Sequence, residues 1–551
     1  MRTICAVCVV LFSACPSSPN PDGGTVGSGG GATGGGVTGG GATGGGATGG
    51  GATGGGATGG GGGGIGPIDG GVPRAVLAAR TTVIPACTLF VDAGNTGTAD
   101  GTRANPFPTI QAAITAASND AVICVAAGTY REALAPQDKY FTLAGGFQSG
   151  SMFQVRDSAM YATRAQGDGT NKFFYVDDPG PTDGQLTAID GFEITGYARG
   201  IERTFYLRQR FDLTNNYIHD NVCTVARDFG GGFMLKNIAG TISNNVIARN
   251  ICGFGGGGAF DEDANGNNDV SIRGNRVEAN FGSEFDDSHG GGLYLQGANF
   301  LVVGNLFIAN RTEKWGAGLY AGARPPAGLL TFARLGWNVY RDNRAGATGG
   351  GFFCDDSARC ESEHEIYERN CGGNIFLDSG NGDTDPTIAS FDHLTNVQAL
   401  DVDCTSPGPG VVVNKDNLAP DAYSFTHAIF EGNRANTDFA TACMQGCTAA
   451  SVNVSWSTVQ TQFTTQEIAV TRAANNRAPV DPLFVDSAGH DFHLRSTFGH
   501  WTPTGMVSDA MSSPLLGAGD PARAAPQNPT RAGTVSELGA YGDSPEASFT
   551  Q

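Results

Sequence analysis

One pattern of hydrophobic and polar positions recurs through the middle of the chain: apolar-x-x-Asn-x-apolar-x-x-Asn. Apolar and polar positions alternate over only a few residues, which is typical of short β-strands and leaves no apolar period of helical length. The second Asn of the pattern marks the repeat, and it stands at Asn221, Asn250, Asn280, Asn310, Asn343 and, in a partial copy, Asn370.

A glycine-rich module separates successive copies, for example at residues 230–233, 290–293 and 349–352. A unit of about 30 residues fits one coil of a β-helix, whereas a propeller blade needs about 40–45 and leucine-rich repeats need a denser leucine framework. The pattern therefore predicts an all-β, right-handed parallel β-helix solenoid. Ile218, Ile247, Val277 and Phe307 should form one buried stack. The repeat asparagines should form another at a corner, because Asn tolerates left-handed backbone.

The N-terminus has the order of a secretory signal: Arg2, an apolar stretch, and small residues before Cys15. Residues 11–15 resemble a bacterial lipobox, in which the Cys is lipidated and becomes the mature N-terminus. We therefore expect a signal peptide at 1–14, lipidation of Cys15 and an outer-membrane or cell-surface location. Plain secretion, with Cys15 as an ordinary thiol, is the alternative.

Composition separates a tether from the body of the protein. Of 551 residues, 86 are Gly, and Gly-Gly-Gly-Ala-Thr repeats from residue 29 to 58 with one substitution. Such a segment cannot bury a core, so residues 15–71 are expected to be a disordered Gly-rich linker. A tract that arose by neutral replication slippage, with no function as a tether, would be flexible for the same reason. The β-helix domain is assigned to residues 72–551.

The charge balance narrows the classes of partner. Lys plus Arg total 33 and Asp plus Glu total 53, which gives a net charge of −20. Phosphates would be repelled, so a nucleic-acid binder is not expected. The one continuous apolar run is too short to span a membrane, so membrane contact should come from the lipid anchor only.

Both ends of the predicted solenoid resemble the right-handed parallel β-helix proteins of the pectin-lyase-like group. The segments that carry this resemblance are 101–114, 127–132, 481–485, 491–494, 513–519 and 538–542. Independently of the resemblance, residues 110–117 are expected to form a short helix that caps the first coil, because the open edge of a β-helix must be covered. The resemblance implies little about activity, because this scaffold hosts lyases, hydrolases, epimerases, adhesins and inert surface proteins.

Ten cysteines remain once Cys5, Cys8 and Cys15 are set aside, and an even number in an exported chain suggests disulfides. Cys223 and Cys252 each follow a repeat Asn by two residues, so they should stack on neighbouring coils within bridging distance. Sequence proximity and elimination supply the other pairs: Cys354–Cys360, Cys443–Cys447, Cys87–Cys124 and Cys371–Cys404. A cysteine metal site is disfavoured, because no paired Cys-x-x-Cys set is present.

Residues 261–269 match the first half of a calcium loop, with candidate ligands at Asp261, Asp263, Asn265 and Asp269. The closing Glu is replaced by Ile272, so no EF-hand is expected. The motif predicts Ca²⁺ as the one cofactor to consider, with a solvated acidic turn as the alternative.

The loops before each glycine module should stack along one ridge. They carry candidate catalytic residues Asp286, Asp287, His289 and Lys314, and candidate substrate-binding residues Trp315 and Arg227. Paired carboxylates could perform glycosidase acid–base chemistry, or hold calcium while Lys314 or Arg227 abstracts a proton in a lyase. Any solvated solenoid also needs polar loops.

Two functions therefore stay open. The first is a surface-anchored lipoprotein whose β-helix binds a polysaccharide or a cell-surface ligand. The second is a tethered polysaccharide lyase or glycoside hydrolase.

Overall fold

The computed structural model describes residues 68–69, 72–73, 80–136, 138–176, 185–204, 209–225, 227–261, 268–283, 288–322, 330–380, 385–433, 438–459, 468–523 and 536–550. The chain divides into two units, residues 1–64 and 65–551, and every described residue belongs to the second. The expected signal peptide, Cys15 and almost all of the linker lie outside the described residues.

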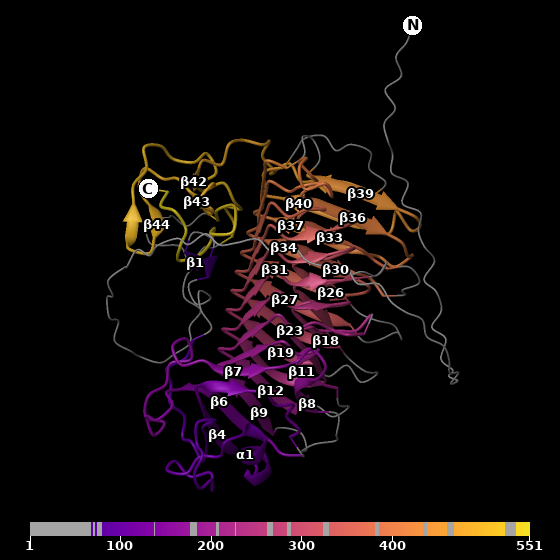
Figure 1. The fold of residues 1–551 in the computed structure, drawn as a ribbon. Helices are drawn as coiled ribbons and strands as arrows, with labels where there is room; N and C mark the ends of the chain where they lie inside the picture. The colour runs from indigo at the N-terminus through magenta and orange to yellow at the C-terminus, as the bar shows by residue number, and fades with distance from the viewer. Residues whose placement is uncertain are drawn as a thin grey trace, which may run out of the picture. The chain divides into compact units, whose positions relative to one another are not determined.

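Three long parallel sheets form the walls of a right-handed β-helix, which confirms the predicted fold class (Figure 1). A 14-stranded sheet comprises β3 (Leu89–Val91), β4 (Ala121–Ala126), β6 (Phe141–Phe147), β9 (Leu186–Asp190), β12 (Gln209–Thr214), β15 (Ile238–Ser243), β19 (Asp269–Arg273), β23 (Ala298–Val303), β27 (Thr331–Gly336), β31 (Arg359–Glu363), β34 (Ile388–Asp392), β37 (Ala422–Thr426), β40 (Ser451–Ser455) and β41 (Val470–Arg472).

The two other walls have shorter strands. The 11-stranded sheet comprises β5 (Gly128–Tyr130), β7 (Thr163–Gln166), β10 (Phe192–Thr195), β13 (Tyr217–His219), β16 (Val246–Ala248), β20 (Arg276–Glu278), β24 (Leu306–Ile308), β28 (Val339–Arg341), β32 (Ile366–Glu368), β35 (Thr395–Val397) and β38 (Ile429–Glu431). The 10-stranded sheet comprises β8 (Lys172–Val176), β11 (Arg199–Arg203), β14 (Phe233–Lys236), β18 (Gly258–Asp261), β22 (Leu293–Gln296), β26 (Leu319–Gly322), β30 (Phe352–Asp355), β33 (Ile375–Leu377), β36 (Val411–Lys415) and β39 (Phe439–Cys443).

Smaller sheets complete the fold. A four-stranded sheet contains β17 (Ile251–Cys252), β21 (Phe281–Gly282), β25 (Arg311–Thr312) and β29 (Arg344–Ala345). Two-stranded sheets pair β1 (Ile68–Asp69) with β2 (Val72–Pro73), β42 (Phe484–Asp486) with β43 (Asp491–Leu494), and β44 (His500–Thr502) with β45 (Gly505–Val507).

The register agrees with the sequence repeat. Ile218 pairs with Ile247, Ile247 with Val277, and Val277 with Phe307, and all four side chains are fully buried. The predicted asparagine stack is confirmed as well: each side-chain Nδ2 donates to the Oδ1 of the next coil, at 2.9–3.1 Å from Asn221 to Asn310. Buried amides thus satisfy one another along the axis, which keeps the corner free of unpaired polar groups.

The predicted capping helix is present as α1 (Ile110–Ala116), and its buried residues include Ile110, Ala113 and Ile114. The Thr109 hydroxyl accepts the Ala112 N–H, and Glu132 accepts the N–H groups of Ile110 and Gln111. These acceptors satisfy the donors at the start of the helix. Within the described part of the chain, no helix has the length and apolar content that a membrane crossing requires.

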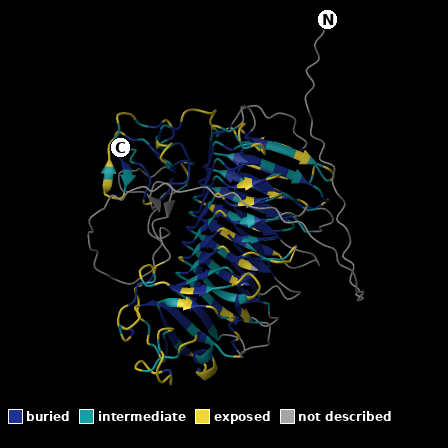
Figure 2. Cartoon of the chain, in the orientation of Figure 1, coloured by how far each residue is buried: buried dark blue, intermediate teal, exposed yellow. Residues whose placement is uncertain are grey.

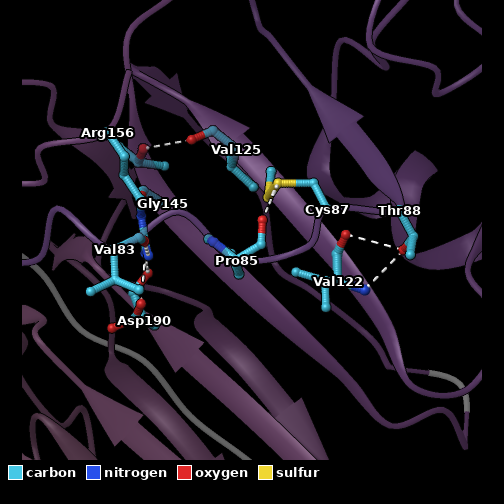
Figure 3. The surroundings of a disulfide bond; sticks show 11 residues. Val83, Pro85, Cys87, Thr88, Val122, Val125, Gly145, Arg156 and Asp190 are labelled. Atoms are coloured by element: carbon cyan, nitrogen blue, oxygen red, sulfur yellow. Dashed lines mark hydrogen bonds and ion pairs between the residues drawn. A yellow bond between two sulfur atoms is a disulfide. The ribbon is translucent and has the colours of Figure 1, made fainter. Parts of the chain in front are cut away.

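An extended segment, residues 80–88, enters the solenoid beside β4 (Figure 3). Cys87 is bridged to Cys124 in β4, and the Thr88 side chain exchanges hydrogen bonds with the Val122 backbone. The guanidinium of Arg156 donates to the carbonyls of Val83 and Gly145 and pairs with Asp190. The start of the described domain is therefore fixed to the first coils by both a covalent and a charged contact.

The C-terminal residues 484–550, here called the C-terminal module, pack on the outward face of the 11-stranded sheet. The strands β42, β43 and β44 lie beside the upper coils in Figure 1. Outward apolar residues of five successive coils are buried in this contact, namely Leu306, Val339, Ile366, Val397 and Ile429. The module supplies Phe484, Phe492, Leu494, Leu515 and Leu538 to the same cluster. Dark blue in Figure 2 marks the buried residues of the sheets.

Five disulfides use all ten cysteines of the described residues: Cys87–Cys124, Cys223–Cys252, Cys354–Cys360, Cys371–Cys404 and Cys443–Cys447. The Cα atoms of Cys223 and Cys252 are 5.0 Å apart. Cys354 and Cys360 are both fully buried in β30 and β31, so their bridge crosses the core between two sheets, whereas the sequence suggested a loop staple. This number of disulfides indicates an extracytoplasmic protein.

Candidate functional site

The outward face of the 10-stranded sheet carries two rows of side chains that the solenoid core does not need. Strand residues alternate between inside and outside, so the second and fourth positions from β14 onward face outward. The second position gives an aromatic row, made of Tyr294, Tyr320, Phe353 and Phe376. The fourth position gives a polar row, made of Lys236, Asp261, Gln296 and Asp355, interrupted by Gly322 and continued by Asp378 and Asn414.

The two rows are joined by hydrogen bonds. The Tyr294 hydroxyl donates to Gln296 Oε1 at 3.2 Å, and the Tyr320 hydroxyl donates to Asp355 Oδ2 at 3.2 Å. The rings of Tyr294 and Tyr320 stack at 4.7 Å, and those of Phe353 and Phe376 at 4.4 Å. The aromatic row is thus packed into a rigid floor that orients the polar row beside it.

Carboxyl groups gather where the polar row approaches the last coils. Asp378 Oδ1 and Asp416 Oδ2 both accept from the Asn414 amide, at 3.1 and 3.0 Å. Burial raises the pKa of Asp378 to about 7, and the charge of Asp416 adds to the effect. Burial, followed by the charges of Asp356 and Asp378, raises the pKa of Asp355 well above its usual range. This end of the row therefore keeps carboxyl protons at a pH where exposed Asp side chains have lost them.

The predicted ridge exists as a ladder of rings beside these rows. Phe229 stacks on Phe254 at 4.8 Å, Phe254 on His289 at 5.7 Å, and His289 on Trp315 at 5.0 Å. Lys314 Nζ lies 5.4 Å from the centre of the Trp315 ring. Because the rings stack face to face, mainly their edges can contact solvent.

The structure brings three of the predicted ridge residues together, namely His289, Lys314 and Trp315, and all three are half-buried. Arg227 is exposed and has a left-handed backbone, and its backbone passes beside Gly253 on the next coil. Asp286 and Asp287 lie outside the described residues. Their predicted roles, and those of the other ridge residues, stay predictions.

The predicted calcium ligands are described only in part. Asp261 is buried in the polar row, where its Oδ2 lies 2.7 Å from Lys236 Nζ. Asp269 is exposed at the start of β19, in a different sheet. Asp263 and Asn265 lie outside the described residues, so calcium binding here stays a prediction.

Sequence reasoning missed the polar row, although a signal was present. Its members stand four residues after the last in-register Gly of each glycine module: Gly232 precedes Lys236, Gly257 precedes Asp261, and Gly351 precedes Asp355. The same offset from Gly292 gives Gln296. Counting from the glycines, and not from the loops before them, would have identified the row.

A second cluster lies where the C-terminal module meets the solenoid. Asp392, His393 and His427 are, among the described residues, a buried group that could hold a metal ion, because their ligand atoms lie within 4.8 Å of one another. Asp392 Oδ1 is 2.8 Å from His427 Nδ1 and 3.2 Å from His393 Nδ1. Imidazole ligands favour transition metals over the predicted Ca²⁺.

The orientation of the two imidazoles limits that role. The rings of His393 and His427 are stacked at 4.7 Å and only 13° from parallel, so one ion cannot lie in both ring planes. His427 Nε2 accepts the Asp520 N–H at 3.2 Å, which places the ring proton on Nδ1, toward Asp392. As arranged, the group is a hydrogen-bonded charge cluster, and an ion would require one ring to turn.

Comparisons with known proteins identify two short segments that match family models. Residues 92–141 match a family described as a protein of unknown function, DUF1565, and residues 462–519 match a family described as disaggregatase related. No curated protein matches the chain.

Two solved structures are similar to the chain at low sequence identity. Pectate lyase Pel9A is 12% identical, with 83% of this chain and 97% of that chain covered and a TM-score of 0.34. GH136 lacto-N-biosidase from Eubacterium ramulus is 12% identical, with 66% of this chain and 67% of that chain covered and a TM-score of 0.33. The parallel β-helix of the chain follows from its own strand topology, and two of its segments match family models.

Proposed function

We propose that this exported protein binds a polysaccharide along the outward face of the 10-stranded sheet. In this proposal the lipid on Cys15 and the Gly-rich linker hold the β-helix at the outer membrane or cell surface. The ligand contacts the polar row, with the ring ladder and Lys314 along its border.

The observation that carries the proposal is the in-register polar row. Six of its seven coils from Lys236 to Asn414 contribute a polar side chain, with Gly322 as the gap, at the spacing of about 4.8 Å that parallel strands impose. A line of hydrogen-bonding groups beside a packed aromatic row, partly exposed at Lys236, Asp378 and Asn414, suits an extended polymer with hydroxyl groups. A compact ligand would use only a small part of it.

The test is binding of the purified protein to a panel of neutral and acidic polysaccharides, with and without calcium. Lys236→Ala and Asn414→Ala alter the two ends of the row at side chains that are not fully buried. Each should weaken binding several-fold, as expected for loss of one or two hydrogen bonds. Arg334→Ala is the matched control, because Arg334 is exposed on the 14-stranded sheet. Equal binding by all variants would reject this face as the site.

A glycoside hydrolase is the second candidate, favoured by the carboxyl pair Asp355 and Asp378. Asp355 and Asp378 come directly after Cys354 and Leu377, which pair in register between β30 and β33. Both aspartates have a raised pKa. A glycosidase needs one protonated and one ionised carboxyl group near neutral pH. Asp378→Asn should then abolish release of reducing ends from a bound polysaccharide while leaving its binding intact. Binding without turnover in the unaltered protein would leave the binding function alone.

A further inference from the structure

We propose that Lys415 and Asn417 become joined by an intramolecular amide bond, with Asp421 transferring the protons. The three residues belong to the end of β36 and the turn that leads to β37. Their relative exposures are 0%, 2% and 1%. Full burial of a lysine ammonium group is rare and costly, so this arrangement requires a chemical reason.

The amine lies against the amide it would attack. Lys415 Nζ is 2.5 Å from Asn417 Oδ1, 2.6 Å from Asp421 Oδ2 and 2.6 Å from the Ala419 carbonyl oxygen. Nζ thus contacts Oδ1, the atom bonded to the amide carbon Cγ that the amine would attack. This proximity converts a slow reaction between two molecules into one within a single fold.

The Asn417 amide is held on both sides. Its Nδ2 donates to the Ser379 carbonyl, and its Oδ1 accepts the Ala419 N–H at 3.0 Å as well as the lysine. The Ala419 N–H is therefore placed to stabilise the negative charge that develops on Oδ1 during attack. Fixed donors of this kind favour addition to the amide over simple hydrogen bonding.

The lysine and the aspartate are enclosed by other buried groups. Tyr423 is 1% exposed, and its pKa is raised well above the ordinary value by burial first and by the charge of Asp421 next. Asp421 Oδ1 accepts the Thr387 N–H at 2.9 Å, which leaves Oδ2 facing the ammonium group. In the proposed step a proton passes from Nζ to Oδ2 across the 2.6 Å between them, which yields the nucleophilic amine.

The reaction balances without any other reactant. Asp421 takes a proton from the lysine ammonium, and the Nζ lone pair forms a bond to Asn417 Cγ. The bond from Cγ to Nδ2 breaks as Nδ2 receives a proton by way of Asp421 and departs as ammonia. The last proton leaves with the ammonia as ammonium, and Asp421 is again ionised. The product is a secondary amide that locks the turn beside Asp416 and Asn414.

Peptide mapping of the reduced and alkylated protein tests the bond. Trypsin should cleave after an unmodified Lys415 and give peptides 370–415 and 416–434. The cross-linked protein should instead give peptide 370–434, uncleaved and lighter by one ammonia, about 17 Da. Lys236 is the internal control, because its Nζ lies 2.7 Å from Asp261 but its side chain is 25% exposed, so cleavage after Lys236 should be normal.

The Asp421→Asn variant distinguishes a loss of amide-bond formation from a loss of folding. This variant keeps the shape of the side chain but cannot take the proton, so cleavage after Lys415 should return while the circular dichroism spectrum stays that of a β-protein. If the variant does not fold, the mass of the unaltered protein decides alone. Complete cleavage after Lys415 would overturn the proposal. A loss of one water, about 18 Da, would place the bond on Asp421 and overturn the assignment to Asn417.

Discussion

At the scale of single residues, the corners of the coils show how the solenoid uses polar side chains in its interior. In the row that begins with Asn216 and Asn245, each amide bonds the next, until Glu365 replaces Asn one coil after Asn338. Glu365 accepts from the N–H and Nδ2 of Asn338 at 3.1 and 2.9 Å and is fully buried. Burial raises its pKa to about 8.

Glu365→Gln should stabilise the protein, increasingly so as the pH rises. A carboxyl group whose folded pKa lies above its unfolded value contributes stability that is present below the unfolded pKa, near 4.5, and is lost as the pH rises toward 8. Glutamine keeps the acceptor for Asn338 and has no proton to lose. Thermal melts at pH 5 and pH 8 measure this: the gain should be small at pH 5 and reach a few kcal/mol at pH 8. A gain that does not depend on pH would show that Glu365 is not held protonated.

The sequence predicted the asparagine row at this corner but not the raised pKa of Glu365. Hydrophobic spacing located Asn338 and Asn343 because both continue the repeat. Glu365 stands five residues before Asn370, as Asn338 stands five before Asn343, so the spacing gives its slot although its residue type breaks the pattern. Its pKa depends on how completely neighbouring coils exclude water, which no local pattern reports.

At the scale of elements, a disulfide of the solenoid joins at most two neighbouring coils. The Cys223–Cys252 bridge links two coils over a separation of 29 residues, and the Cys443–Cys447 bridge spans only 4. In a solenoid each coil contacts its neighbours alone, so each covalent link acts locally.

Replacing Cys223 and Cys252 by Ser should cost about 3–4 kcal/mol of unfolding free energy on the chain-entropy model. The same change at Cys443 and Cys447 should cost about 2 kcal/mol, because the closed loop is shorter. Thermal melts compare the two double variants. Hydrogen exchange should place the loss from the first variant in β16 and β17 and leave the C-terminal module protected. Protection lost along the whole solenoid would contradict the local action of the bridge.

The attachment of the C-terminal module should weaken as the pH rises. His393 lies between Asp392 and the module's Asp543, at 3.2 and 3.1 Å, and Arg523 contacts both carboxylates. These carboxylates raise the pKa of His393 against the opposing effect of burial. Its stabilising effect is therefore complete below the ordinary value of 6.5 and is lost as the pH rises through the raised value. Hydrogen exchange of residues 484–550 should accelerate in that interval beyond the ordinary rise in exchange rate with pH.

His393→Gln should remove this pH dependence. His364 is the matched control: it stacks on His393 at 5.0 Å, and its pKa is lowered to about 4 by burial first and by His393 next. His364 therefore opposes folding only as the pH falls below 6.5, and His364→Gln should leave the alkaline loss unchanged. If the His393→Gln variant still loses protection of residues 484–550 as the pH rises, another group must cause the effect.

At the scale of the whole molecule, the repeat determines one long axis and the features that run along it. The core stack, the asparagine corners and the Cys223–Cys252 bridge all follow from counting about 30 residues per coil, which is why the sequence predicted them. The C-terminal module follows no repeat. Its contacts join segments far apart in the chain, for example His364 Nδ1 with the Ala540 carbonyl oxygen, and such packing has no local signature. The polar row is periodic as well, but its signal is a fixed offset from the glycines and not a feature of the loops.

The length of the polar row leads to a prediction for ligand binding. Seven strands, from β14 to β36, carry the row, and six intervals of about 4.8 Å give a line of about 29 Å. If a polysaccharide lies along this line, affinity should rise with each added sugar until the oligosaccharide spans the row and should then stay constant. Calorimetry with oligosaccharides of increasing length measures this. Lys236→Ala should shorten the length at which affinity levels off, because it removes a contact at one end, whereas a change in the middle should weaken all longer ligands equally. Affinity that is already constant for a disaccharide would show a compact site and contradict binding along the axis.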